Sequence, residues 1–183
     1  MKFNIIVAQC KNGGIGIHNN LPWKIKSDLQ KFYKLTKGYG NNAIIMGRNT
    51  WNSLNNKQLK LRDNLILSTS LNFEFTDENN YITRTFNNIN SISDFCKNKN
   101  YDNVWIIGGE KIYKSFLEYG NIVDNIYLTL IDKDYRCDTF FPNIDNKIFR
   151  CIQHKTHILN INYNEYNEFM DCQVWDRIYK RIN

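Results

Sequence analysis

The sequence lacks several features that would place the protein in common classes. It has no run of about 18 or more apolar residues, which excludes a typical transmembrane helix. Its first residues, Met-Lys followed by an alternating segment, do not form a signal peptide, so we expect a cytoplasmic protein with no membrane partner. The five cysteines are widely spaced and include no Cys-x-x-Cys pair for zinc or redox chemistry. We therefore expect most of them to be buried thiols and expect no metal site.

A dense basic segment is also absent, although the formal net charge is +6. Because the charges are scattered singly, they favour a phosphorylated small molecule over nucleic acid as a partner. Asparagine pairs such as Asn19-Asn20 and Asn87-Asn88 fall where the apolar periodicity lapses and predict turns. The abundance of asparagine indicates a compositional bias and carries no functional weight. A length of 183 residues predicts one domain, 1–183, with a substantial core.

Apolar and β-branched segments alternate with helical patterns over most of the chain. The predicted strands are 3–10, 42–47, 64–70, 81–84, 103–107 and 124–131. The predicted helices are 27–37, a short one opening at 48 with Thr50 as a plausible cap, one near 91–99 and one from about 110 to 119. Two longer segments, 149–161 and 167–178, joined through 162–164, predict an antiparallel hairpin.

This order of elements predicts an α/β fold. Strands separated by helices form a central, mostly parallel, twisted sheet, and the hairpin adds an antiparallel end at the sheet edge. The first strand, 3–10, is apolar almost throughout and should be central. Helices should flank the sheet.

Ligands of such sheets bind at the carboxyl ends of the strands. Those ends are here the glycine-rich segment after Cys10, Gly47-Arg48, Ser68-Thr69 and Gly108-Gly109. An arginine can fork onto a phosphate, hydroxyls can bind it, and a helix N-terminus offers backbone amides. A ligand with two or three phosphate groups, such as a dinucleotide, could contact all of these. A surface ion pair for Arg48 and a tight turn for the glycine pair are the alternatives, since no Gly-x-Gly-x-x-Gly or P-loop spacing occurs.

Asp28 is the acid with the most informative surroundings. Apolar residues at intervals of three and four predict that 27–37 forms an amphipathic helix, on which Asp28 and Phe32 share a face. The helix is entered through a rigid turn beside Trp23, so the carboxylate would lie in a partly dry cleft. From this stretch alone, a cap formed by Ser27 and Asp28 is the alternative, because both residue types favour helix starts.

Several motifs occur in a fixed order. They are Gly-Ile-Gly-x-x-x-x-Leu-Pro-Trp at 14–23, Asp28, Phe32, Met46-Gly47-Arg48-x-Thr50-Trp51, Arg62, Ser68-Thr69, Ile107-Gly108-Gly109 with Tyr113, Tyr127-Leu128-Thr129 and Asp138-Thr139-x-Phe141-Pro142. In this order the chain resembles the dihydrofolate reductase family over nearly its full length. The resemblance implies NADPH-dependent reduction of 7,8-dihydrofolate to 5,6,7,8-tetrahydrofolate, by hydride transfer to pterin C6 with N5 protonated through a water. We expect a monofunctional, monomeric enzyme of one-carbon metabolism.

The resemblance also implies roles for individual residues. The acid matching Asp28 binds the 2-amino group and N3 of the pterin, and Thr129 holds it by a hydrogen bond. Leu21 gates the water and, with Trp23, completes the catalytic set, while Arg62 would bind the α-carboxylate of the glutamate tail. The other implied substrate-binding residues are Ile6, Val7, Leu29, Phe32, Leu54, Leu59 and Ile107.

For NADPH, the resemblance implies that Arg48 and Ser68 hold the 2′-phosphate. The turn at 108–113 would follow the pyrophosphate, and the peptide bond between Gly108 and Gly109 would be cis. The implied cofactor-binding residues are Ala8, Ile15 and Ile107 around the nicotinamide, together with Gly16, Gly47, Arg48, Asn49, Thr50, Leu67, Ser68, Thr69, Gly108, Gly109, Glu110, Lys111, Ile112 and Tyr113.

Two departures from the family pattern concern ligand binding. Glu110 stands where many members have a small residue and would repel a nearby pyrophosphate, although Lys111 offsets that charge. The segment 55–61 lacks the prolines common before Arg62. The family pattern therefore does not fix how Leu59 and Arg62 are positioned against the substrate tail. The histidines are interpreted as solvated side chains: His18, His154 and His157.

Three alternatives to this function follow from the same residues. The reductase domain of the riboflavin pathway shares the fold and NADPH, but Trp23, Asp28 and Phe32 favour a pterin. A basic nucleic-acid-binding module would require a clustered basic stripe, which the sequence lacks. A binding-only relative without catalysis is disfavoured because Asp28, Thr129 and Arg62 are all present.

Overall fold

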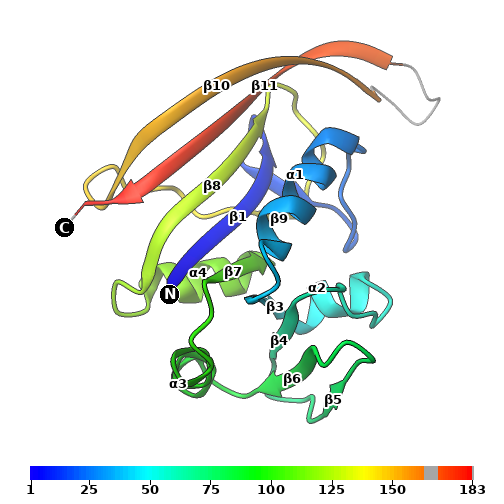
Figure 1. The fold of residues 1–183 in the computed structure, drawn as a ribbon. Helices are drawn as coiled ribbons and strands as arrows, with labels where there is room; N and C mark the ends of the chain where they lie inside the picture. Colours follow the sequence, from blue (N-terminus) through cyan, green and yellow to red (C-terminus); the bar gives the residue numbers. More distant parts are fainter. Residues whose placement is uncertain (163–168, 183) are drawn as a thin grey trace.

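A computed structural model describes residues 1–162 and 169–182 (Figure 1). The helices are α1 Lys26–Lys37, α2 Arg48–Ser53, α3 Ile89–Lys99 and α4 Glu110–Glu118. The strands are β1 Lys2–Cys10, β2 Gly14–Gly16, β3 Asn42–Gly47, β4 Asp63–Leu67, β5 Glu74–Thr76, β6 Ile82–Phe86, β7 Asn103–Gly108, β8 Val123–Ile131, β9 Thr139–Phe140, β10 Phe149–Asn162 and β11 Phe169–Arg181. None of the described helices is long and apolar enough to cross a membrane.

The main sheet confirms the predicted α/β architecture. Within the described residues it has nine strands in the order β10-β11-β8-β1-β7-β3-β4-β6-β5, so β1 is central. The pairs from β8 to β6 are parallel, whereas β11 joins β8 antiparallel and β10 joins β11 antiparallel. The long hairpin of β10 and β11 therefore forms one edge, as Figure 1 shows. A separate small sheet pairs β2 with β9.

Alternate residues of the central strands face opposite sides of the sheet. Ile5 and Ile45 are fully buried in a cluster that includes side chains of α3 and α4. Ile6 and Ile44 belong to a second cluster, packed with side chains of α1 and α2. Because both faces are covered, the parallel strands are apolar almost throughout, which is why their positions could be predicted. Figure 1 shows α1 and α2 on one side of the sheet and α3 and α4 on the other.

Several local predictions differ from the structure. The strands β2, β5 and β9 were not predicted, and the strand expected at 64–70 ends at Leu67. The N-caps of α1 and α2 are Ile25 and Gly47, so neither Ser27, Asp28 nor Thr50 caps a helix. Residues 163 and 164 of the predicted hairpin turn lie outside the described residues. All five cysteines are free thiols, and Cys151 is the exposed one.

A buried pair joins β4 to the chain after α3. The Tyr101 hydroxyl donates to Asp63 Oδ2 at 2.5 Å, and Asp63 Oδ1 accepts from the Ile82 amide at 2.8 Å. Burial, together with the neighbouring Asp63 carboxylate, raises the pKa of Tyr101, so its hydroxyl remains a donor.

Replacing Tyr101 with phenylalanine is expected to lower the free energy of unfolding by about 1–3 kcal/mol, because a buried carboxylate oxygen loses its hydrogen bond. Urea denaturation measures the change. Tyr39→Phe is the control, since that ring is fully exposed. Equal unfolding free energies for Tyr101→Phe and the parent protein would contradict this account of the pair.

Candidate active site

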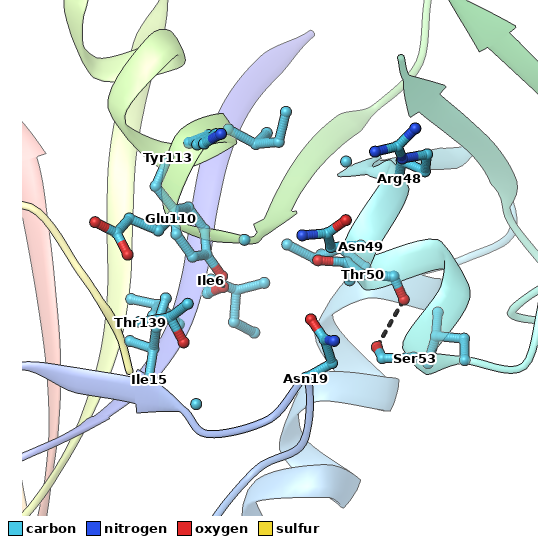
Figure 2. Close-up of a pocket in the computed structure, with 18 of the residues that line it drawn as sticks. Ile6, Ile15, Asn19, Arg48, Asn49, Thr50, Ser53, Glu110, Tyr113 and Thr139 are labelled. Carbon is cyan, nitrogen blue, oxygen red and sulfur yellow. Dashed lines mark hydrogen bonds between the residues drawn. The ribbon is translucent and has the colours of Figure 1, made fainter. Parts of the chain in front are cut away.

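The carboxyl ends of β1, β3, β4 and β7 open into a cavity of about 1380 Å³. Cavities that hold one small molecule usually have volumes of roughly 300–1,000 Å³. The larger volume leaves room for two ligands side by side. Figure 2 shows part of this cavity, with Ile6 between the wall that carries Arg48 and Thr50 and the wall that carries Glu110.

The predicted site residues come together around this cavity. All of them line it except Thr129 and Gly108. Thr129 is hydrogen-bonded to Asp28, and Gly108 directly precedes Gly109 in the chain. The lining residues that were not predicted to bind ligands are Asn19, Asn20, Lys24, Ile25, Tyr33, Ser53, Ser70, Asn87, Asn88, Ile89, Ser115 and Thr139. Of these, Asn19, Asn20 and Thr139 lie within recognised motifs, which could have indicated them.

Asp28 lies in the first turn of α1 and lines the cavity. Its Oδ1 accepts a hydrogen bond of 2.7 Å from the Thr129 hydroxyl on β8. Only 16% of the Asp28 side chain is exposed, so interactions of its charge are screened less than at an open surface. Its other oxygen, Oδ2, accepts no hydrogen bond from the described residues and remains able to accept from a ligand.

Apolar side chains form the walls beside Asp28. Phe32 and Leu54 pack against the buried cluster that contains Ile6 and line the cavity. Leu21 differs from them, because 51% of it is exposed at the cavity. Trp23 is buried, and its indole N–H has no hydrogen-bond partner in the described part of the chain. A buried donor of this kind favours a bound water or ligand acceptor beside it.

Arg62 is held rigidly although it lines the cavity. Only 2% of the residue is exposed, and its Nε donates to the Lys60 carbonyl at 3.0 Å while Nη1 donates to the Thr36 hydroxyl. The guanidinium lies 5.1 Å from the centre of the Tyr33 ring, within the range of a cation–π contact. Burial lowers the pKa of Arg62, but an arginine remains charged in proteins.

A cluster of anion-binding groups lies at the end of β4. Arg48 Nη1 donates to the Ser70 hydroxyl at 2.7 Å, and the Ser68 and Ser70 hydroxyls are 3.4 Å apart. Ser68 Oγ also accepts from the Ser70 and Leu71 amides, which fixes its position. An arginine and two hydroxyls in contact can bind a phosphate group. Ser70 was not predicted as a ligand, because the sequence indicates a strand over 64–70 that includes it, whereas β4 ends at Leu67 and leaves Ser70 free to reach Arg48.

The start of α4 forms the neighbouring part of the cavity. The peptide bond between Gly108 and Gly109 is cis, as the resemblance implied. Gly108 has φ +108°, and a Cβ there would lie 2.9 Å from the Tyr113 ring, so a side chain does not fit. The buried Tyr113 hydroxyl donates to the Ile6 carbonyl at 3.0 Å. A Cβ at Gly109 would be 3.6 Å from the Thr50 hydroxyl, which shows how closely α2 and α4 approach here.

Comparison with known proteins assigns the family. A family model described as dihydrofolate reductase matches residues 2–174. The chain belongs to the dihydrofolate reductase family. Its relatives include the dihydrofolate reductase of Heliothis virescens, 34% identical over 158 residues and covering 83% of this chain and 85% of the relative. The enzyme of Gallus gallus is 36% identical over 157 residues, covering 81% and 82%. This protein therefore has the activity of the family, which is the NADPH-dependent reduction of dihydrofolate.

A solved structure supports the fold independently. Dihydrofolate reductase from Enterococcus faecalis, complexed with NADP(H) and RAB-propyl, superposes with a TM-score of 0.77 at 22% identity, covering 100% of this chain and 97% of the other. This likeness shows that the dihydrofolate reductase fold is preserved although the sequences have diverged widely.

The departure at Glu110 has a structural explanation. Its carboxylate accepts a hydrogen bond of 3.0 Å from the Phe140 amide of β9. Figure 2 shows Glu110 on the same side of the cavity as Thr139 and opposite Arg48. The carboxylate is thus tied to the small sheet, and the repulsion of a pyrophosphate by Glu110 stays a prediction.

His18 and His157 are exposed as predicted, but His157 also has a side-chain partner. His157 is partly exposed, but its Nε2 lies 3.2 Å from Asp176 Oδ2 on the adjacent strand β11. Asp176 in turn contacts Lys31, which reaches Asp28. His157 is therefore exposed to solvent and also connected to Asp28 through Asp176 and Lys31. His18 remains mostly exposed, 3.8 Å from Asp138.

Proposed function

We propose that the cavity binds dihydrofolate with its pterin ring at Asp28 and NADPH across the ends of β3, β4 and β7. The observation that carries this proposal is that a shielded carboxylate, Asp28, and the Arg48 cluster line the same cavity. The carboxylate suits the donor edge of a pterin, and the cluster suits a phosphate. The volume of about 1380 Å³ accommodates both molecules.

The substrate half of the site orients the pterin. Asp28 accepts hydrogen bonds from the 2-amino group and N3, while Thr129 fixes the rotamer of the carboxylate. Phe32 and Leu54 pack against the rings with Ile6, Val7, Leu29, Leu59 and Ile107. Arg62, held by Lys60 and Thr36, presents its guanidinium to the α-carboxylate of the glutamate tail.

The cofactor half suits a phosphorylated dinucleotide. Arg48, Ser68 and Ser70 would hold the 2′-phosphate, and the amides at the start of α4 would bind the pyrophosphate next to Thr50. The close approach of α4 to Thr50, with no side chain at Gly109, leaves the backbone accessible to the ligand. Bound NADPH supplies the hydride that C6 of the pterin accepts.

Asp28 acts by orientation and electrostatics. A protonated N5 makes C6 a better hydride acceptor, and the negative charge of Asp28 stabilises that cation. The carboxylate binds the opposite edge of the ring, so it does not deliver the proton itself. Leu21, exposed at the cavity, admits the water that protonates N5, and Trp23 borders the same region.

The setting of the enzyme is part of the proposal. We propose a cytoplasmic monomer that serves one-carbon metabolism and the supply of thymidylate and purine precursors. The charges of the chain are scattered, which argues against nucleic acid as a partner.

Replacing Arg48 with leucine is expected to raise KM for NADPH on the order of tenfold or more, because a charge-assisted hydrogen bond to the 2′-phosphate is lost. NADH lacks that phosphate, so its KM should stay nearly unchanged. Steady-state kinetics with both cofactors measure the effect, with Lys34→Met as a control for net charge. An equal change for NADPH and NADH would argue against Arg48 as the 2′-phosphate ligand.

The substrate is tested by following NADPH oxidation with dihydrofolate and with the ribosylamino-pyrimidine of the riboflavin pathway. We expect turnover of dihydrofolate only, with inhibition by methotrexate. Turnover of the pyrimidine alone would overturn the substrate assignment and leave the cofactor site standing. Salt-sensitive binding to RNA that NADPH does not displace would instead support a nucleic-acid function.

A further inference from the structure

Lys31 connects the site acid to the C-terminal hairpin. It lies one turn after Asp28 on α1, and its Nζ is 3.3 Å from Asp28 Oδ1 and 2.5 Å from Asp176 Oδ1 on β11. The same ammonium donates to the Thr129 hydroxyl, which is itself bonded to Asp28. Neither Lys31 nor Asp176 lines the cavity, so neither is placed to touch a bound ring directly, whereas Asp28 lines it.

The charges of this group are unbalanced. Lys31 contacts two carboxylates, Asp28 and Asp176, so these three side chains carry a net charge of −1 when all are ionised. Their side chains are 16–29% exposed, so solvent screens them only partly. Among the described residues, the exposed His157 on β10 also contacts this group, with its Nε2 3.2 Å from Asp176 Oδ2.

We propose that Lys31 is a positioning residue that sets the charge selectivity of the Asp28 site. It offsets part of the negative charge of Asp28 and thereby lowers the preference of the site for a cationic ring over a neutral one. Asp176 opposes this effect, because it draws the same ammonium towards β11. The inference rests on the proposed function, in which Asp28 binds the ring of the ligand.

The sign of each change follows from the charge count. Without the ammonium the group carries −2, which strengthens binding of a cationic ring relative to a neutral one. Without the charge of Asp176 the group is neutral, because Lys31 then offsets the charge of Asp28 alone. Binding of a cationic ring is therefore weakened relative to binding of a neutral ring. A purely structural role for either residue would reduce the binding of both kinds of ring together. The two substitutions therefore separate charge from packing.

The experiment compares methotrexate with folate. Both carry a glutamate tail, but the 2,4-diamino ring of methotrexate is basic and pairs with a carboxylate as a cation, whereas the 2-amino-4-oxo ring of folate is neutral. Dissociation constants are measured by tryptophan fluorescence at one fixed pH. A pH-dependent change in the charge of His157 then does not enter the comparison between variants. The quantity of interest is the ratio of the folate constant to the methotrexate constant.

Lys31→Met is expected to raise this ratio on the order of tenfold, and Asp176→Asn to lower it by a similar factor, since each changes one charge close to Asp28. The double variant should return near the parent ratio. Lys31→Arg keeps the charge and should leave the ratio unchanged, as should Lys34→Met, which removes a charge elsewhere on α1.

Opposite shifts in the two single variants support the proposal. Shifts in the same direction, or no shift in either, overturn it. If Lys31→Met does not fold, Asp176→Asn alone decides by the direction of its shift. Failure of the proposed function is a separate result, because a parent protein that neither binds these ligands nor reduces dihydrofolate would refute that function directly.

Discussion

Replacing Asp28 with asparagine is expected to lower the turnover of dihydrofolate at neutral pH on the order of 100-fold or more. The amide removes the negative charge that stabilises the protonated pterin, and one of its two polar atoms donates where the carboxylate accepted. The fold should persist, because asparagine can still accept the hydrogen bond from Thr129 and Lys31 keeps its contact with Asp176. Turnover should recover partly in acid, where the substrate is already protonated.

Steady-state kinetics from acid to neutral pH test this expectation, with circular dichroism to confirm folding. Ser27→Ala is the matched control, because Ser27 precedes Asp28 on the same helix, is exposed and does not line the cavity. Near-normal turnover of Asp28→Asn at neutral pH would remove Asp28 from its proposed role.

Arg62→Leu is expected to raise KM for dihydrofolate on the order of 100-fold. The substitution removes the guanidinium that Lys60 and Thr36 hold in place, so the α-carboxylate of the substrate loses its bidentate partner. A dihydropterin without the glutamate tail should show little change in KM. The contrast between the two substrates identifies the tail as the partner, since a general loss of folding would affect both.

The control for Arg62 is Arg84→Leu. Arg84 pairs with Glu74 at the surface, with 41% of its side chain exposed, and does not line the cavity. Thermal unfolding of both variants shows whether either substitution destabilises the fold. An equal rise in KM for the full substrate and the dihydropterin would mean that Arg62 does not bind the tail.

The central strands could be predicted from the sequence because they are buried on both faces. The ends of β3, Asn42–Gly47, agree with prediction, and β1, β7 and β8 differ by a residue or so. The strands that were missed are β2, β5 and β9, with three, three and two residues. Strands this short show no period of their own, and their pairing depends on the tertiary structure.

The site residues that carry motifs were predicted, whereas their partners were not. Ser70 reaches Arg48 from beyond the end of β4, and Phe140 fixes Glu110 across 30 positions of sequence. The contact between Lys31 and Asp176 joins residues 145 positions apart. No local pattern indicates such contacts, because each arises only when folding brings together segments that are distant in the sequence.

The most direct test is a crystal structure of the protein with folate and NADP⁺ bound together. The account predicts the pterin 2-amino group and N3 within hydrogen-bond distance of Asp28, with the 2′-phosphate on Arg48, Ser68 and Ser70. A pterin bound away from Asp28, or a 2′-phosphate outside the Arg48 cluster, would contradict it.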